Sequence, residues 1–238
     1  ALLSTIVSDL CVAAGLTSGQ IDVTALEDVV LGYVRPRVMS ARAAIEPLRQ
    51  VYRFDAVESG DQIKFVKRGG ASVATIQIDD LGARIDSAGE PIEHSRRQES
   101  ELPAAVRVSY QSPTIDFQVG VQQAQRRAGS SAQLVQVELP LVLSDLEAAQ
   151  TADVLLYEAW VSRTQRKISA ARSYTRLEPT DVITVVDGAF SYVLRVMDKN
   201  EDGGVVELDC QDEDAATYSP DSTAGAVSGG GSAIRFDG

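Results

Sequence analysis

The stretch SDLEAAQTADVLLYEAWV, residues 144–161, carries the clearest helical pattern in the sequence. Ser144 is a preferred N-cap, and Glu147 three residues later completes a capping box. Behind them, apolar residues recur at the three- and four-residue spacing of a single helix face: Ala148, Ala152, Leu155, Leu156, Ala159 and Trp160. The pattern predicts a long helix near 144–161, which must lay its apolar face on another layer of the protein.

The residues on both sides of this helix carry the pattern of β-strands. Downstream, runs rich in β-branched residues are separated by turn residues, at 167–175, 182–186, 192–197 and 205–210. Upstream, 104–110 alternates between apolar and polar residues, and 134–143 is a further β-rich run interrupted at Pro140. The run at 182–186 is apolar on both faces, as in a barrel or between layers. We therefore predict a β-rich, barrel-like antiparallel subdomain over 70–218, with the long helix laid on it.

The preceding residues, 1–69, predict a mixed helix and strand unit. Helical patterns and a hairpin pattern follow one another here, at 1–14, 40–52, 54–57 and 63–66. Ser40 is a good N-cap for the second helix, but Pro47 inside that pattern should kink the helix or move its start to a later turn. The pair Gly69-Gly70 marks the end of the unit. The fold class predicted for the whole chain is α+β.

The two ends of the chain carry no targeting pattern. The apolar start, 1–14, is interrupted by polar residues and lacks a basic n-region, so it is not predicted to be a signal peptide. Because the chain opens on a helical pattern at Ala1 without Met, we expect a fragment of a longer polypeptide. The last residues, 219–238, are rich in Ser, Gly and Ala and predict a linker or an arm that orders only against a partner.

The net charge limits the classes of partner. The chain has 238 residues, with 34 acidic against 22 basic side chains and a formal net charge of −12. A field of that sign repels phosphates and argues against a dedicated nucleic-acid-binding module, although DNA can still pass close by without being trapped. No apolar run approaches the roughly 20 residues that a membrane-spanning helix needs, so we expect no membrane insertion.

The nucleophile and metal-ligand residues are few. His94 is the single histidine, it lies in a charged stretch, and no G-x-S-x-G motif is present, so a solvated or interface role is predicted for it. Cys11 and Cys210 are far apart in the sequence and lack a CxxC partner, which predicts two buried apolar side chains and no zinc site. Neither Gly69-Gly70 nor Gly229-Gly230-Gly231 has the spacing of a phosphate-binding loop.

The remaining charged clusters also favour structural roles. The acidic runs 198–202 and 209–214 lack the spacing of a calcium loop and predict solvated turns. Carboxylate pairs for glycoside hydrolysis stay open, but the chain has only 5% aromatic residues for sugar platforms, and Trp160 lies on the apolar helix face. The pairs Arg96-Arg97 and Arg126-Arg127 predict surface or subunit contacts. No catalytic, cofactor-binding or metal site is predicted, and we expect the chain not to be an enzyme.

Several segments in order resemble one family, the large tail-tip proteins of siphophages and gene transfer agents, also called baseplate megatron or host-specificity proteins. The segments that carry the resemblance are Asp22–Leu26, Val30–Tyr33, Ser40–Leu48, Phe54–Gly60, Leu139–Leu143, Leu155–Trp160 and Leu177–Val182. The last is close to the family's usual L-E-P-G-D-V, with Thr180 where glycine is common. The likeness extends over about residues 9 to 218, and its strength lies in the order and spacing of the segments.

The resemblance implies a structural hub of a phage tail tip or baseplate, made in the host cytoplasm and carried in the virion. Such hubs assemble as homotrimers on the tail axis, and their partners are the distal tail or tube protein above and tail fibres or other tail-tip proteins below. DNA passes through the lumen, and we expect acidic side chains to face it. Two alternatives stay open: a phage-borne cell-wall hydrolase, and a receptor- or glycan-binding module.

Overall fold

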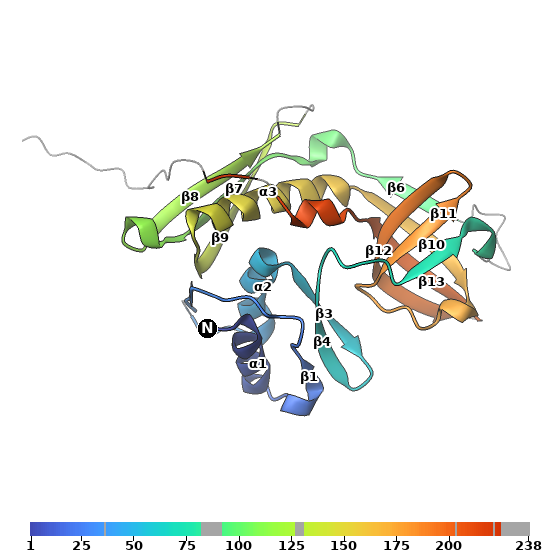
Figure 1. Ribbon diagram of the computed structural model, residues 1–238, viewed down its shortest axis with the longest axis horizontal. Helices are drawn as coiled ribbons and strands as arrows, with labels where there is room; N and C mark the ends of the chain where they lie inside the picture. Colours follow the sequence, from blue (N-terminus) through green and yellow to red (C-terminus); the bar gives the residue numbers. More distant parts are fainter. Residues whose placement is uncertain (36, 82–91, 127–130, 203, 221, 225–238) are drawn as a thin grey trace, which may run out of the picture.

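The computed structural model describes residues 1–35, 37–81, 92–126, 131–202, 204–220 and 222–224. Within these ranges the chain folds into three α-helices and three mixed β-sheets, so the predicted α+β class is confirmed (Figure 1). The predicted long helix, α3, spans Asp145–Val161 and begins at the predicted capping box. The Ser144 Oγ accepts from the Glu147 N–H at 3.2 Å, and a Glu147 carboxylate oxygen accepts from the Ser144 N–H at 2.8 Å.

The N-terminal unit combines two helices with a small sheet. Its elements are α1 Leu3–Ala13, β1 Ile21–Asp22, α2 Ala41–Tyr52, β3 Phe54–Ser59 and β4 Gln62–Lys67. The strands form a sheet in the order β1-β4-β3, which contains the predicted hairpin. Ser40 is the N-cap of α2 and accepts from the Ala43 N–H at 3.3 Å. The helix contains Pro47 without starting later, so that alternative was wrong.

The central sheet carries α3 on one face. Its strands are β2 Gly32–Tyr33, β7 Pro103–Ser112, β8 Gln118–Gln125 and β9 Gln133–Val142, in the order β2-β9-β7-β8. The helix α3 packs against β7 and β8 (Figure 1). Its first residue is tied to the sheet, because an Asp145 carboxylate oxygen accepts from the Tyr110 hydroxyl at 2.5 Å and from the Ser112 hydroxyl at 2.8 Å.

The third sheet has six strands. They are β5 Ala74–Gln77, β6 Ile92–Arg96, β10 Thr164–Ala171, β11 Val182–Asp187, β12 Phe190–Asp202 and β13 Val205–Asp212. The order is β5-β11-β12-β13-β10-β6, and the sheet curls so far that Leu81, just after β5, forms an isolated bridge with Ala170 of β10. The ladder does not close into a barrel within the described residues.

The prediction of a barrel-like, antiparallel subdomain over 70–218 needs correction, because no closed barrel forms within the described residues and the sheets are mixed. Each sheet contains one parallel pair: β1 with β4, β7 with β9, and β5 with β11. In the central sheet the cause is the path of the chain. It turns from β7 into the adjacent β8 and then returns to the other side of β7, so β9 runs in the same direction as β7. Helix α3 follows β9 and covers the sheet.

The apolar side chains form two cores. One unites α1, α2 and the β3–β4 hairpin with the central sheet and α3, and the other lies within the curled six-stranded sheet. The predicted boundary near residue 69 stays a prediction. Of the predicted arm, 219–238, residues 221 and 225–238 lie outside the described residues. No helix within the described residues is long and apolar enough to span a membrane.

Candidate functional site

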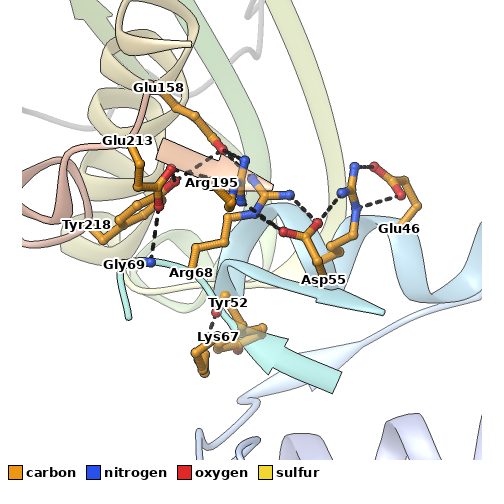
Figure 2. Close-up of polar contacts among 11 residues, drawn as sticks. Glu46, Tyr52, Asp55, Lys67, Arg68, Gly69, Glu158, Arg195, Glu213 and Tyr218 are labelled. Atoms are coloured by element: carbon orange, nitrogen blue, oxygen red, sulfur yellow. Dashed lines mark hydrogen bonds and ion pairs between the residues drawn. The ribbon is translucent and has the colours of Figure 1, made fainter. Parts of the chain in front are cut away.

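Six charged side chains from separate segments meet where the N-terminal unit, α3 and the six-stranded sheet adjoin (Figure 2). We call them the ionic cluster, and they are Arg49, Asp55, Arg68, Glu158, Arg195 and Glu213. They come from α2, from β3, from the residue after β4, from α3, from β12 and from the residue after β13. The cluster is therefore the point at which the three parts of the molecule are tied by charge.

Asp55 is the shared acceptor on one side of the cluster. Its two oxygens accept from the Nε and Nη2 of Arg68, each at 2.7 Å, in a bidentate pair. They also accept from Arg195 Nη1 at 2.9 Å and Arg49 Nη1 at 2.6 Å. Burial alone would raise the pKa of Asp55, but the hydrogen bonds and charge of Arg68 and the charge of Arg195 outweigh it, and the pKa lies below its ordinary value.

Arg195 connects Asp55 to the other carboxylates. Its side chain is only 4% exposed, and it lies 3.5 Å from Glu158 and 3.5 Å from Glu213. Burial raises the pKa of Glu213, and the opposing charge of Arg195 and the Gly69 N–H do not fully offset that rise. The Tyr218 hydroxyl lies 3.4 Å from both Glu158 and Glu213, and burial, together with the Glu158 charge, raises its pKa.

The arrangement of the cluster suits a structural role, in which ion pairs hold separate segments in a fixed relative position. Arg68 and Arg195 are the buried arginines, and each pairs with a buried or half-buried carboxylate. Arg49, at the edge of the cluster, is 36% exposed and also pairs with Glu46 at 2.9 Å. Removing one partner of such a buried group leaves an uncompensated charge and costs about 3–5 kcal/mol. The cluster therefore fixes how the hairpin, α3 and the six-stranded sheet are placed relative to one another.

A polar cavity of about 270 Å³ lies beside the cluster. Its lining includes Tyr52, Arg53, Lys67, Gln150 and Tyr218. The Tyr52 hydroxyl and the Arg53 Nε are buried there without a hydrogen-bond partner in the described part of the chain. A polar cavity of this size has room for several waters, which commonly satisfy such groups.

The residues singled out from the sequence are dispersed over the fold. His94 is exposed on β6, opposite Arg166 of β10. Cys11 and Cys210 are buried free thiols, as predicted, and they lie in different cores. Burial raises the pKa of both, that of Cys210 to about 12. Trp160 is a core residue, also as predicted, and its Nε1 donates to the Pro103 carbonyl at 2.8 Å.

The charged runs are placed differently from the prediction. Residues 198–202 belong to β12 and residues 209–212 to β13, so these acidic runs are strands and not turns. Within the described ranges no group of three or more His, Cys, Asp or Glu side chains is placed to hold a metal ion. Arg126 stacks 4.0 Å from the centre of the Trp160 ring, while Arg127 lies outside the described residues. Arg96 is exposed on β6.

The ionic cluster was missed in the sequence analysis because its members are scattered between positions 49 and 213. One signal was present. Arg195 interrupts the apolar run Val193-Leu194-Arg195-Val196-Met197, and a lone arginine in a buried strand needs a carboxylate partner. The identity of that partner requires the fold.

The family model described as "Putative phage tail protein" matches residues 40–198, which is more than half of the chain. The matched range contains both the long helix and five of the six members of the ionic cluster. The chain belongs to this family of phage tail proteins.

Solved structures extend this result. A chain in the virion of the native gene transfer agent particle is 26% identical, with a TM-score of 0.86, and the match covers 93% of this chain and 49% of that one. This chain thus spans about half the length of the gene transfer agent chain. The tail protein from Neisseria meningitidis MC58 shares the fold at 16% identity and a TM-score of 0.62, covering 92% and 69% of the two chains.

A third structure shares the fold more distantly. The 43 kDa tail protein of prophage MuSo2 from Shewanella oneidensis is 8% identical with a TM-score of 0.55, and the match covers 91% of this chain and 63% of that one. No curated protein sequence matches this chain.

Proposed function

We propose that this chain is a structural hub segment of a phage-type tail tip or baseplate, where three copies assemble around the tail axis. The observation that carries the proposal is the match over 93% of the chain, at a TM-score of 0.86, to a chain of the gene transfer agent virion. The ionic cluster supports it, because a protein that connects other tail parts needs its own segments held in one arrangement, and ion pairs between the N-terminal unit, α3 and the six-stranded sheet do this.

In this proposal the hub joins the tail tube protein above to fibres or other tail-tip proteins below. The units 1–69 and 70–218 are its two subdomains, and 219–238 is an arm that reaches a neighbour. DNA passes through the lumen without specific contacts, and acidic side chains line that channel, in keeping with the net charge of −12. The chain acts through shared surfaces and not through catalysis.

Labelling intact particles tests the location. An epitope tag after Gly238 is introduced into the gene in a particle that carries this chain, and gold-labelled antibody is imaged by electron microscopy, with untagged particles as the control. The proposal expects label only at the distal end of the tail. Label along the tube or on the head would contradict it.

A muralytic assay separates the proposal from the hydrolase alternative. The purified chain is incubated with dye-labelled cell walls, and the proposal expects no dye release above buffer. Release that a single Asp, Glu or His94 substitution abolishes would favour the enzyme. Specific binding of the isolated chain to cells would instead favour the receptor- or glycan-binding module.

A further inference from the structure

Four arginines line one hollow beside the C-terminal end of α3. We call it the arginine hollow, and its arginines are Arg96 of β6, Arg126 directly after β8, Arg163 between α3 and β10, and Arg166 of β10. Its volume is about 530 Å³. Arg96 and Arg126 belong to the two arginine pairs that the sequence analysis assigned to surface contacts, and the fold brings them to the same place.

The arginine hollow is basic although the chain is acidic. The chain has 34 acidic and 22 basic side chains, but the lining has four arginines and only two carboxylates, Asp212 and Asp214. Asp212 pairs with Arg166 at 2.7 Å, and Asp214 accepts from the Ala216 N–H at 2.9 Å. Arginines therefore exceed carboxylates, and like charges that converge in this way repel one another until an anion enters.

Aromatic rings hold three of the guanidinium groups in place. Arg126 and Arg163 lie over the Trp160 ring, 4.0 Å and 5.7 Å from its centre. Arg166 lies 4.3 Å from the centre of the Tyr192 ring. A guanidinium that stacks by its face has its N–H donors in the perpendicular plane, and this geometry suits two parallel hydrogen bonds to a carboxylate. Stacking therefore prepares these arginines for carboxylate binding before any ligand arrives.

Covering Trp160 does not account for the whole arrangement. The ring is 6% exposed, and Arg126 alone stacks closely on it. Arg96 is exposed, and no carboxylate in the described part of the chain lies within ion-pair distance of it. Arg163 pairs at 3.5 Å with Glu99, which is 50% exposed, so solvent screens that pair. Tyr157, 51% exposed, adds an apolar surface to the same hollow.

A polypeptide fits the arginine hollow better than a nucleic acid. A nucleic acid carries a phosphate at every step and needs a basic groove that follows its backbone. The hollow is a single confined site, and Asp212 and Asp214 in its wall would repel a continuous row of phosphates. A polypeptide can place carboxylates opposite the arginines and neutral or apolar side chains opposite the aspartates and Tyr157.

We propose that the arginine hollow binds an acidic segment, rich in Asp and Glu, of another tail protein. The acidic runs of this chain at 198–202 and 209–212 are held in β12 and β13, so they are not free to enter the hollow of a second copy. The inference rests on the proposed function, because it names the chemistry of one partner that the hub would join.

A titration with hexaglutamate tests this site, because Trp160 is the single tryptophan of the chain. Isothermal titration calorimetry measures binding to the full chain, and the emission of Trp160 reports whether binding occurs beside Arg126 and Arg163. We expect saturable binding with a change in emission, and an affinity about tenfold lower for the Arg96→Gln variant. Arg96 is exposed and does not stack on Trp160, so the substitution keeps the fold and the reporter. Arg172→Gln is the matched control, because Arg172 is equally an exposed arginine but lies outside the hollow.

Several results would overturn the inference. They are no saturable binding, binding that leaves the Trp160 emission unchanged, and an equal loss of affinity in Arg96→Gln and Arg172→Gln. Tighter binding of an oligothymidylate of the same charge would make the hollow a nucleic-acid site instead. A fall in the oligomeric mass of the Arg96→Gln chain, measured by light scattering, would make it a contact between copies.

The failure of this inference is distinguishable from the failure of the proposed function. A chain that is labelled at the distal end of the tail but does not bind hexaglutamate keeps its hub role and loses this partner surface. A chain that binds hexaglutamate through Arg96 but is labelled elsewhere in the particle keeps the binding site and loses the hub role.

Discussion

Arg195 illustrates how single residues hold this molecule together. It is almost fully buried in an apolar strand, and three carboxylates from other segments surround it: Asp55, Glu158 and Glu213. Burying the guanidinium costs desolvation free energy, and the ion pairs with these carboxylates offset that cost. The buried carboxylates are stabilised by the arginine in the same way. Each member of the ionic cluster is therefore required mainly because the others are present.

Replacing Arg195 with methionine should be strongly destabilising. The Arg195→Met variant leaves Asp55 and Glu213 with less compensation in a buried site, and we expect the free energy of unfolding to fall by about 3–5 kcal/mol. Lys167→Met is the control, because Lys167 is 38% exposed and its pair with Glu207, at 3.2 Å, should contribute less than about 1 kcal/mol. Urea denaturation measures both, and equal losses would contradict the role given to the cluster.

The pH dependence of stability should differ in sign for two carboxylates. The pKa of Asp55 is lowered by its arginines, so its stabilising effect is present above its unfolded pKa of about 3.9 and is lost as the pH falls through its folded pKa. The Asp55→Asn variant should therefore be less stable than the wild type at pH 7, and the gap should narrow at acidic pH. Urea denaturation across the pH range measures this gap.

Glu213 provides the opposite case. Because burial raises its pKa above the unfolded value of about 4.3, the folded state gains stability as the pH falls through the raised pKa. The stability of the wild type relative to Glu213→Gln should therefore rise as the pH is lowered, in the same denaturation series. If both variants followed the same trend, the two directions of pKa shift would be wrong.

Thr180 has a backbone conformation that suits glycine. Its φ is +82°, a left-handed value that costs a residue with a side chain about 1–2 kcal/mol. The tail-tip proteins that this sequence resembles commonly have glycine at this position, in the segment L-E-P-G-D-V. Glycine removes this strain, but it also makes the unfolded chain more flexible, which costs about 0.4–1 kcal/mol. The net effect of Thr180→Gly should therefore be a rise of up to about 1 kcal/mol in the free energy of unfolding. A lower melting temperature for the variant would be the contrary result.

At the scale of elements, the helices could be predicted well because their signals are local. The caps Ser144 and Ser40 need only neighbouring residues. The strand β8 was missed, since its glutamines and Gly120 lack the usual β-forming side chains. It forms because α3 and β7 supply the packing and the ladder. The parallel pairs likewise depend on contacts that local patterns do not encode.

The Gly69-Gly70 link between β4 and β5 offers a matched pair of substitutions. Gly69 has a φ of +74°, and a Cβ added there would lie 2.7 Å from the ring of Tyr218. Gly70 has no such φ, and an added Cβ would have nothing within 4 Å. Gly69→Ala should therefore cost at least about 1–2 kcal/mol, and Gly70→Ala almost nothing. Thermal melts of the two variants compare them, and similar melting temperatures would show that this link is not restrained.

At the scale of the whole molecule, the sequence predicted the class of protein better than its candidate site. The order of short segments was sufficient for the resemblance, and the family match confirms it. In the ionic cluster, Asp55 and Arg195 are 140 positions apart in the sequence, and Glu158 lies between them. Only the fold brings these three side chains together.

The central claim is that this chain works as one of several identical copies arranged around the tail axis. Electron cryomicroscopy of tails from a particle that carries the chain, reconstructed without imposed symmetry, tests this most directly. The account predicts density for three copies related by rotation about the axis. A single copy beside the axis would contradict it.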